Sequence, residues 1–190
     1  MKRIIENCIK ESISVKSEIL NSQTIIKNIQ LIVLKAIEAY KNDRKILLCG
    51  NGGSAADAQH IAAELSGRFY KDRKPLFAEA LHVNTSFITA VANDYGYDNI
   101  YSRMVESVGR EGDILIGIST SGNSKNVKNA LRKANDIGMI TIGFTGSNIT
   151  DMDELSNIMI KIPSNVTPRI QESHILIGHV ICELIEENLF

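Results

Sequence analysis

The sequence predicts an α/β fold in which helices cover both faces of a parallel sheet. Short apolar runs typical of buried strands alternate with segments whose apolar residues recur at helical spacing. A regular alternation of strands and helices is the pattern of a parallel sheet packed between two layers of helices. Two further helical segments precede the first strand and lie outside this alternation.

The two leading helices are expected over residues 2–20 and 24–41. In the second helix, apolar side chains recur every three or four residues, at Ile25, Ile26, Ile29, Ile32, Val33, Ala36, Ile37 and Tyr40. Helices placed before the first strand either cap the sheet or join an oligomer interface.

Five strands are expected, at residues 45–49, 76–83, 113–119, 139–145 and 157–162. The other helices are expected over residues 54–66, 85–92, 99–108, 124–136 and 168–188. Pro168 falls near the first turn of the last helix, where a missing N–H is tolerated. The chain shows no linker and no internal repeat. We therefore expect a single domain over residues 1–190, with residues 1–43 as an N-terminal helical segment.

Composition excludes several classes of protein. The 190 residues carry a formal net charge of −1, and Lys and Arg form no basic stripe, so nucleic acid is not an expected partner. No apolar run approaches the ~18 residues of a membrane span, and the first twenty residues lack the apolar core of a signal peptide. Cys8, Cys49 and Cys182 are too few and too scattered for a disulfide framework. We expect a cytoplasmic protein with no membrane partner.

Two turns have the composition of anion-binding loops. They are GNGGS at residues 50–54 and STSGNS at residues 119–124, and each follows an expected strand. Glycines allow a ligand close to the backbone, and the following helix offers free N–H groups with a partial positive charge. Each turn alone is also compatible with a tight connection, and Ser124 with a simple helix cap. Two such turns at the same edge of one sheet favour a phosphate site.

Two nucleotide-binding patterns fit the first turn poorly. The turn matches the loose dinucleotide pattern G-x-G-x-x-A, which requires an acidic residue at the end of the second strand. That strand ends in LHVN at residues 81–84, and Glu79 lies inside it. The glycines are not followed by the Lys-Ser or Lys-Thr pair of a P-loop.

His60 and Glu64 share one helix face directly after the first turn. A spacing of four residues suits a metal site or an acid–base pair, although such pairs are also common on helix surfaces. A phosphate held near Ser54 would allow a substrate to lie along this helix toward Glu64.

The last helix supplies the candidate partners of this pair. Spacing alone does not decide between His174 and His179. Gln171 and His179 lie on one stripe, but ~12 Å apart along an ideal helix. To reach one metal their side chains must lean toward each other, or the ligands must come from more than one subunit.

Four ordered motifs resemble the phosphoheptose isomerases of the sugar isomerase (SIS) domain family. The motifs are GNGGSAADAQHIAAELSGR, AVANDYG, GISTSGNS and RIQESHILIGH, and the similarity covers nearly the whole chain. The resemblance implies a flavodoxin-like three-layer sandwich with two N-terminal helices added, assembled as a homotetramer with active sites between subunits. It also implies the interconversion of sedoheptulose 7-phosphate and D-glycero-D-manno-heptose 7-phosphate, which supplies nucleotide-activated heptoses.

The resemblance assigns roles residue by residue. Residues that match substrate and phosphate contacts are Asn51, Gly52, Gly53, Ser54, Asn93, Asp94, Ser119, Thr120, Ser121 and Ser124. The ligands of one zinc ion per subunit match His60, Glu64, Gln171 and His179, of which Glu64 and Gln171 are also expected to touch the sugar. Some members carry a sugar-contacting Asp before the RIQE arginine, where this chain has Pro168.

The expected chemistry moves a proton between C1 and C2 of the sugar through an enediol. It needs a base, an acid–base group near the oxygens and stabilisation of negative charge, and we expect Glu64 and His179 to be the two proton carriers. Because a zinc-bound group is a poorer proton carrier, either the ligands exchange during turnover or the metal mainly orders the site. The alternatives are an SIS isomerase of another sugar phosphate and a non-catalytic SIS protein that binds a replication initiator. The sequence leaves open whether the product enters ADP-heptose or GDP-heptose synthesis.

Overall fold

The computed structural model describes residues 1–190 and contains one five-stranded sheet. Its strands are β1 (Ile46–Gly50), β2 (Ala78–Ala80), β3 (Ile114–Ile118), β4 (Ile140–Thr145) and β5 (Ile158–Lys161). All neighbouring strands are parallel, in the order β2-β1-β3-β4-β5. From β1 the chain moves outward to β2, then crosses back to β3 and continues toward β5. This is the flavodoxin-like order, with its reversal point between β1 and β3.

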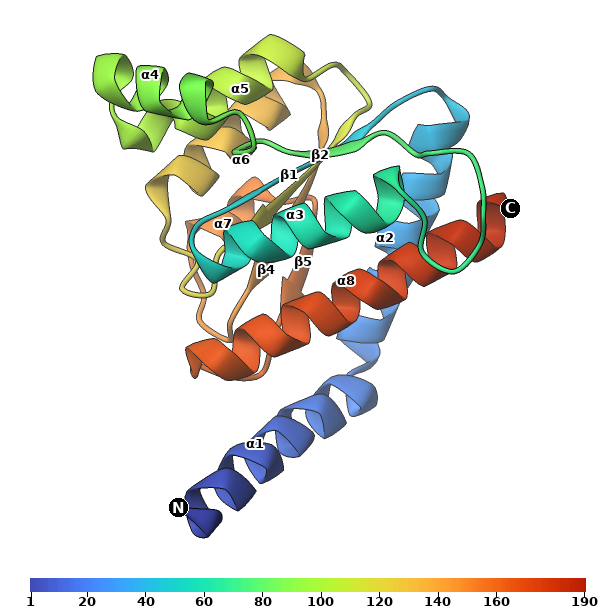
Figure 1. Ribbon diagram of the computed structural model, residues 1–190, viewed down its shortest axis with the longest axis vertical. Coiled ribbons are helices and arrows are strands. Elements are labelled where there is room, and N and C mark those ends of the chain that lie inside the picture. The colour runs from blue at the N-terminus through green and yellow to red at the C-terminus, as the bar shows by residue number, and fades with distance from the viewer.

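Helices cover both faces of the sheet, which confirms the predicted three-layer sandwich (Figure 1). One face carries α1 (Lys2–Asn21), α2 (Gln23–Lys41), α3 (Gly53–Ser66) and α8 (Thr167–Leu189). The other face carries α4 (Thr85–Tyr95), a 3-10 turn η1 (Tyr97–Asn99), α5 (Ile100–Val108), α6 (Lys125–Ile137) and α7 (Asp151–Leu155). No helix combines the length and the apolar character needed to cross a membrane.

The core lies in two layers, one on each side of the sheet. Leu48 and Ile116 belong to the larger cluster, under α2, α3 and α8. Leu47 and Leu115, their neighbours along the same strands, belong to the smaller cluster, under α5 and α6. Because successive strand residues point to opposite faces, a sheet covered twice needs apolar residues at every position. This explains the continuous apolar runs of the central strands.

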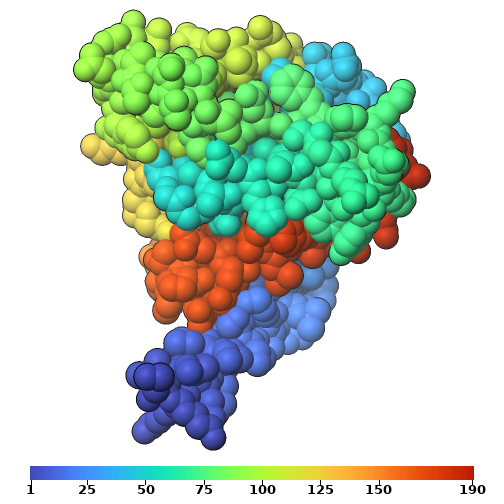
Figure 2. Space-filling model, in the orientation of Figure 1, coloured from blue at the N-terminus to red at the C-terminus, as the bar shows by residue number.

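The two leading helices have different roles in the subunit. α2 packs against β5 and α8 and buries one full apolar stripe, so it caps the sheet. α1 projects beyond the body of the molecule, as Figures 1 and 2 show, and only Val15 and Ile19 of this helix are buried. The side chains of four isoleucines on α1 are exposed, namely Ile4, Ile5, Ile9 and Ile13.

Two elements differ from the expectations. β2 covers three residues, not the predicted 76–83, because Leu76 leaves the sheet edge and donates its N–H to the Leu65 carbonyl at 3.1 Å. α7 was not predicted. Its five residues begin with a capping box, in which Thr150 and Asp153 satisfy each other's backbone N–H groups, and Met152 is buried beneath it. The remaining expected elements are present within a few residues of their predicted bounds.

Candidate active site

The two predicted anion-binding turns lie side by side at the carboxyl edge of the sheet. β1 and β3 are adjacent, so the turns that follow them meet at the reversal point of the strand order. The amides of Asn51 and Asn126 exchange two hydrogen bonds of 2.9 Å, which join the first turn to α6. Asn126 is buried and was missed at the sequence level, because a single asparagine in the first turn of a helix has no distinctive pattern.

The first turn directs the start of α3 toward this edge. Gly52 has φ of +56°, a left-handed conformation that favours glycine. Tyr97 donates its hydroxyl to Oδ1 of Asn51 at 3.1 Å, and Ser54 is buried in the first turn of α3. No side chain caps α3. The N–H groups of Ser54 and Ala55 donate to the carbonyls of Asn51 and Gly52 at 3.0 Å, so the start of α3 offers an anion chiefly the partial positive charge of its N-terminus.

The second turn gathers hydroxyl groups. The Oγ atoms of Ser119 and Ser124 lie 3.0 Å apart, and the exposed Ser121 accepts a hydrogen bond from the Asn123 N–H at 3.2 Å. Thr120 is half-buried between them. Ser124 occupies the N-cap position of α6, but its side chain makes no capping hydrogen bond. Its hydroxyl contacts Ser119 instead, so the turn is more than a simple helix cap.

Three side chains from two distant helices of the chain meet where α3 packs against α8. Nε2 of His60 lies 3.1 Å from Oε1 of Glu64 and 3.2 Å from Nε2 of His179. One ligand atom from each residue lies within 4.8 Å of the other two. The helices come this close because residue 178 is glycine, where an added Cβ would lie 2.6 Å from Cδ1 of Ile61.

The structure distinguishes the two histidines of α8. His174 is fully buried, and its Nε2 lies 3.2 Å from the Thr145 carbonyl oxygen. Burial lowers the pKa of His174 to about 4, and the contact with Thr145 opposes this shift only in part. His174 is thus a neutral residue of the core, whereas His179 lies beside His60.

Comparisons with known proteins identify the family of the chain. A family model of the SIS domain matches residues 9–146. A phosphoheptose isomerase from Clostridium acetobutylicum is 53 % identical over 190 residues, which cover 100 % of this chain and 97 % of that protein. The chain belongs to the phosphoheptose isomerase family of SIS-domain proteins. A second relative named as a phosphoheptose isomerase, from Aneurinibacillus thermoaerophilus, is 52 % identical over 100 % of this chain and 96 % of its own length.

Solved structures show the same fold for the phosphoheptose isomerase family. A phosphoheptose isomerase from Neisseria gonorrhoeae superposes with a TM-score of 0.92 at 39 % identity, over 98 % of both chains. A phosphoheptose isomerase from Francisella tularensis superposes with a TM-score of 0.93 at 35 % identity, over 97 % of both chains. The agreement includes the two leading helices, since nearly the whole chain is covered.

Gln171, which was expected to be a metal ligand, lies at the other end of the α3–α8 contact. Its side-chain amide packs against Gly53, where an added Cβ would occupy the same space. Gly53 precedes His60 by seven residues, about 10 Å along a helix. This distance agrees with the expectation that Gln171 and His179 lie ~12 Å apart along α8. Within one subunit, Gln171 therefore stands beside the first anion-binding turn.

Asn93 and Asp94 lie on α4, away from the α3–α8 contact. Both are exposed, and Nδ2 of Asn93 donates to Oδ1 of Asp94 at 2.8 Å. Neither side chain hydrogen bonds to the anion-binding turns of its own subunit. Pro168 lies in the first turn of α8, as predicted, and leaves that position without a carboxylate.

Asp57 is a polar residue of α3 that the sequence analysis missed. It lies between the first turn and His60, and its Oδ2 is buried without a hydrogen-bond partner. Burial raises the pKa of Asp57 to about 6, and the nearby His60 opposes this shift. A spacing of three residues from His60 was the signal that could have identified it.

The donor set of His60, Glu64 and His179 suits a zinc ion. Two imidazole nitrogens and one carboxylate oxygen are common zinc ligands, and tetrahedral geometry with bonds of 2.0–2.1 Å separates neighbouring nitrogens by about 3.3 Å. The two Nε2 atoms lie 3.2 Å apart. The site therefore offers three ligands and leaves further positions for another ligand, water or substrate.

Proposed function

We propose that this protein interconverts sedoheptulose 7-phosphate and D-glycero-D-manno-heptose 7-phosphate, in the supply of heptose for nucleotide-activated sugars. The observation that carries the proposal is the convergence of Glu64 and His179 beyond two anion-binding turns. It is supported by relatives at 53 % and 52 % identity that are named phosphoheptose isomerases. A protein that only binds a partner has no need of an acid–base pair beside a phosphate site.

The phosphate of the sugar binds at the two turns. The uncapped start of α3 and the hydroxyls of Ser119, Ser121 and Ser124 provide hydrogen-bond donors and a partial positive charge. Holding the far end of the sugar fixes its first two carbons with respect to the proton carriers. This positioning lowers the entropic part of the barrier.

Glu64 and His179 carry the protons in two steps, formation of the enediol and its conversion to the aldose. Starting from the ketose, the Glu64 carboxylate takes a proton from C1, the electron pair forms the C1–C2 double bond, and His179 protonates O2. The product of this half is a neutral enediol. In the second half His179 takes the proton from O1, Glu64 returns its proton to C2, and the aldehyde forms at C1. Both side chains return to their starting protonation states.

We further propose that one zinc ion per subunit binds to His60, Glu64 and His179, with Gln171 as the fourth ligand suggested by the family. When bound, zinc supplies a Lewis acid that polarises the sugar carbonyl. Glu64 can serve two roles because it has two carboxylate oxygens. Oε1 lies 3.1 Å from His60, and Oε2 makes no hydrogen bond and remains free to accept a proton.

We infer that the protein is a homotetramer with active sites shared between subunits. The exposed isoleucines of α1 support this, because a projecting helix with an apolar face is stabilised by a second copy. The placement of Asn93, Asp94 and Gln171 away from Glu64 also supports it, since a neighbouring subunit can bring such residues together. The three free cysteines support a cytoplasmic location.

The test is to incubate the purified protein with sedoheptulose 7-phosphate and to measure aldose phosphate formation by NMR or chromatography. Ketohexose and ketopentose phosphates serve as competing substrates. We expect conversion of the heptulose phosphate, with a higher kcat/KM than for the shorter sugars. A preference for a shorter sugar would favour another SIS isomerase activity, and failure to convert any of them would contradict the proposal.

A further inference from the structure

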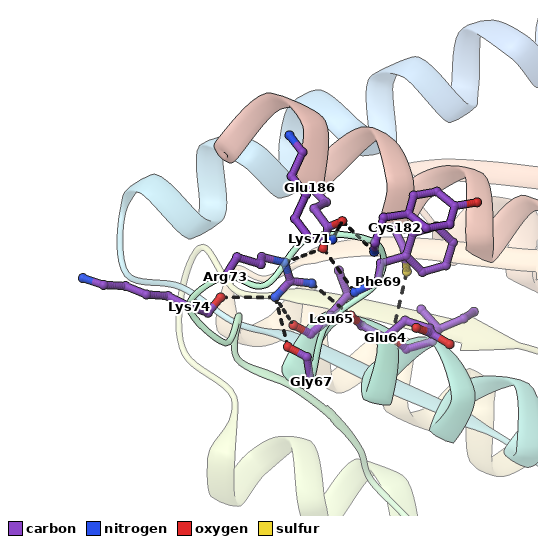
Figure 3. A network of polar contacts seen from close by, with 11 residues as sticks. Glu64, Leu65, Gly67, Phe69, Lys71, Arg73, Lys74, Cys182 and Glu186 are labelled. Atoms are coloured by element: carbon purple, nitrogen blue, oxygen red, sulfur yellow. Dashed lines mark hydrogen bonds and ion pairs between the residues drawn. The ribbon is translucent and has the colours of Figure 1, made fainter.

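A buried ion pair joins the segment after α3 to the last turns of α8, near Glu64 (Figure 3). Nε of Arg73 lies 2.7 Å from Oε2 of Glu186, and their side chains are 1 % and 2 % exposed. Arg73 belongs to the segment that connects α3 to β2, and Glu186 lies on α8, seven residues after His179. Neither residue belongs to the motifs that indicated the function.

The carboxylate of Glu186 organises the segment after α3. It accepts hydrogen bonds from three successive backbone N–H groups, those of Phe69 at 3.1 Å, Tyr70 at 2.7 Å and Lys71 at 2.7 Å. Burial alone would raise the pKa of Glu186, but these N–H groups and Arg73 outweigh it and hold the pKa at about 2. The carboxylate is therefore charged at neutral pH, and it accepts hydrogen bonds from the three N–H groups and from Arg73.

The guanidinium of Arg73 caps the C-terminus of α3. Nη2 donates to the Glu64 carbonyl at 3.0 Å, and Nη1 donates to the Leu65 carbonyl at 2.9 Å. Nη1 also contacts the carbonyls of Gly67 and Lys74 at 3.4 and 3.2 Å. The carbonyls of Glu64 and Leu65 are in the last turn of α3 and lack partners within the helix, and the planar guanidinium can donate to both.

The same segment contacts the imidazole of His179. The ring centroids of Phe69 and His179 are 5.8 Å apart with an interplanar angle of 41°. The backbone N–H of Phe69 is one of the groups that Glu186 binds. Thus the ion pair contacts both proton carriers, one directly and one indirectly. Arg73 donates a hydrogen bond to the Glu64 carbonyl, and Glu186 binds the backbone N–H of Phe69, whose ring packs against His179.

We propose that Arg73 and Glu186 are positioning residues, which fix the Glu64 carboxylate with respect to the His179 imidazole. Stability alone is a weak reason for such a pair, because the desolvation of two charges offsets much of their attraction. Apolar contacts such as Ile61 against Gly178 already hold α3 and α8 together. The ion pair adds a fixed orientation of the last turn of α3, and proton transfer depends on that geometry.

A second buried ion pair, outside α3 and α8, provides a matched control. Asp113 is 1 % exposed, its Oδ2 lies 2.6 Å from Nζ of Lys45, and it accepts backbone N–H groups of Lys45 and Arg110. It thus resembles Glu186 in burial, pairing and backbone contacts, but its partners Lys45 and Arg110 belong to neither α3 nor α8. Asp113→Asn should destabilise the protein without affecting the site.

The experiment compares Glu186→Gln, Arg73→Lys and Asp113→Asn, all at a temperature well below the lowest Tm of the set. The inference rests on the proposed isomerase activity, so kcat and KM are measured with sedoheptulose 7-phosphate. We expect kcat to fall at least tenfold in Glu186→Gln and Arg73→Lys, with KM changed less than about twofold because the phosphate turns are intact. Asp113→Asn should keep the wild-type kcat despite a lowered Tm.

A second readout does not depend on turnover. The affinity for Zn²⁺ alone is measured by competition with a chromophoric chelator, and it should fall at least tenfold in Glu186→Gln and Arg73→Lys but not in Asp113→Asn. The inference is overturned if the two variants match Asp113→Asn in both kcat and Zn²⁺ affinity. If the wild type does not convert the sugar, the proposed function fails, and the Zn²⁺ affinities alone decide whether the ion pair positions the site.

Discussion

Nε2 of His60 and Nε2 of His179 lie 3.2 Å apart, although 119 residues separate them in the sequence. The spacing of residues indicated a site at His60 and Glu64 but did not identify His179 as their partner. Their contact depends on the packing of α3 against α8, which brings the Glu64 carboxylate to the same place.

Glu64→Gln should abolish isomerisation while the protein remains folded. The amide keeps the shape of the carboxylate but cannot accept a proton from C1, so kcat should fall by about 10²–10⁴-fold. Turnover is measured with sedoheptulose 7-phosphate, and circular dichroism checks the fold. Glu187→Gln, an exposed change on α8, serves as the control. Near-normal activity of Glu64→Gln would remove this residue from the mechanism.

Removal of metal should inactivate the protein if zinc acts in catalysis. Dialysis against a chelator should lower the zinc content, measured by elemental analysis, from one ion per subunit to near zero, and added Zn²⁺ should restore activity. Activity that persists without metal would restrict zinc to a structural role.

The choice between the two histidines of α8 can be tested in the same way. His179→Ala should lose zinc because it removes a ligand, whereas His174→Gln should retain it because residue 174 faces the core at Thr145. Metal content and Zn²⁺ affinity are compared for the two variants. Loss of zinc from His174→Gln in a folded protein would contradict the assignment.

Acid should destabilise the fold through His174. Its pKa is lowered from 6.5 to about 4, so below pH 6.5 the unfolded chain binds a proton that the folded protein does not. The free energy of unfolding is therefore unaffected by protonation of His174 above pH 6.5. It decreases as the pH falls from 6.5 toward 4, by about 3 kcal/mol in total. Urea unfolding at several pH values measures this slope. His174→Gln should show a shallower slope, and an unchanged slope would exclude His174 as its source.

A charge on the apolar face of α1 should disrupt the oligomer. Ile9 and Ile13 are 55 % and 59 % exposed in the subunit, so their replacement by Asp should leave the subunit fold intact. We expect Ile9→Asp to lower the mass measured by light scattering, because a buried aspartate in an interface is strongly unfavourable. Lys10→Asp, an exposed neighbour, is the control. An unchanged mass for Ile9→Asp would place the interface elsewhere.

The sequence predicted the central elements well, for a physical reason. Strands such as Ile46–Gly50 are buried on both faces and are therefore apolar throughout, and the glycine turns that follow them are conspicuous. β2 lies at the edge of the sheet, where an apolar run need not pair along its whole length. The predicted strand was therefore longer than the three residues observed. α7 was missed because five residues cannot show a helical period, and its capping box has Asp153 in place of the more common Glu or Gln.

The site was predictable only in part. His60 and Glu64 could be paired from their spacing, because a helix brings residues four apart onto one face. The role of His179, in contrast, depended on family resemblance, since the sequence contains no information on how α8 packs. Asn126 and the Arg73–Glu186 pair gave no local pattern, because tertiary packing alone creates their partners.

Gly178 implies a restriction on how this family member can change. With no side chain at residue 178, α3 and α8 touch directly, and a single methyl group would overlap the Ile61 side chain. A larger side chain at one of these positions therefore requires a smaller one at the other. We expect residues 61 and 178 to covary in natural and designed sequences. An engineer who wishes to place a larger residue at position 178 has to make residue 61 smaller at the same time.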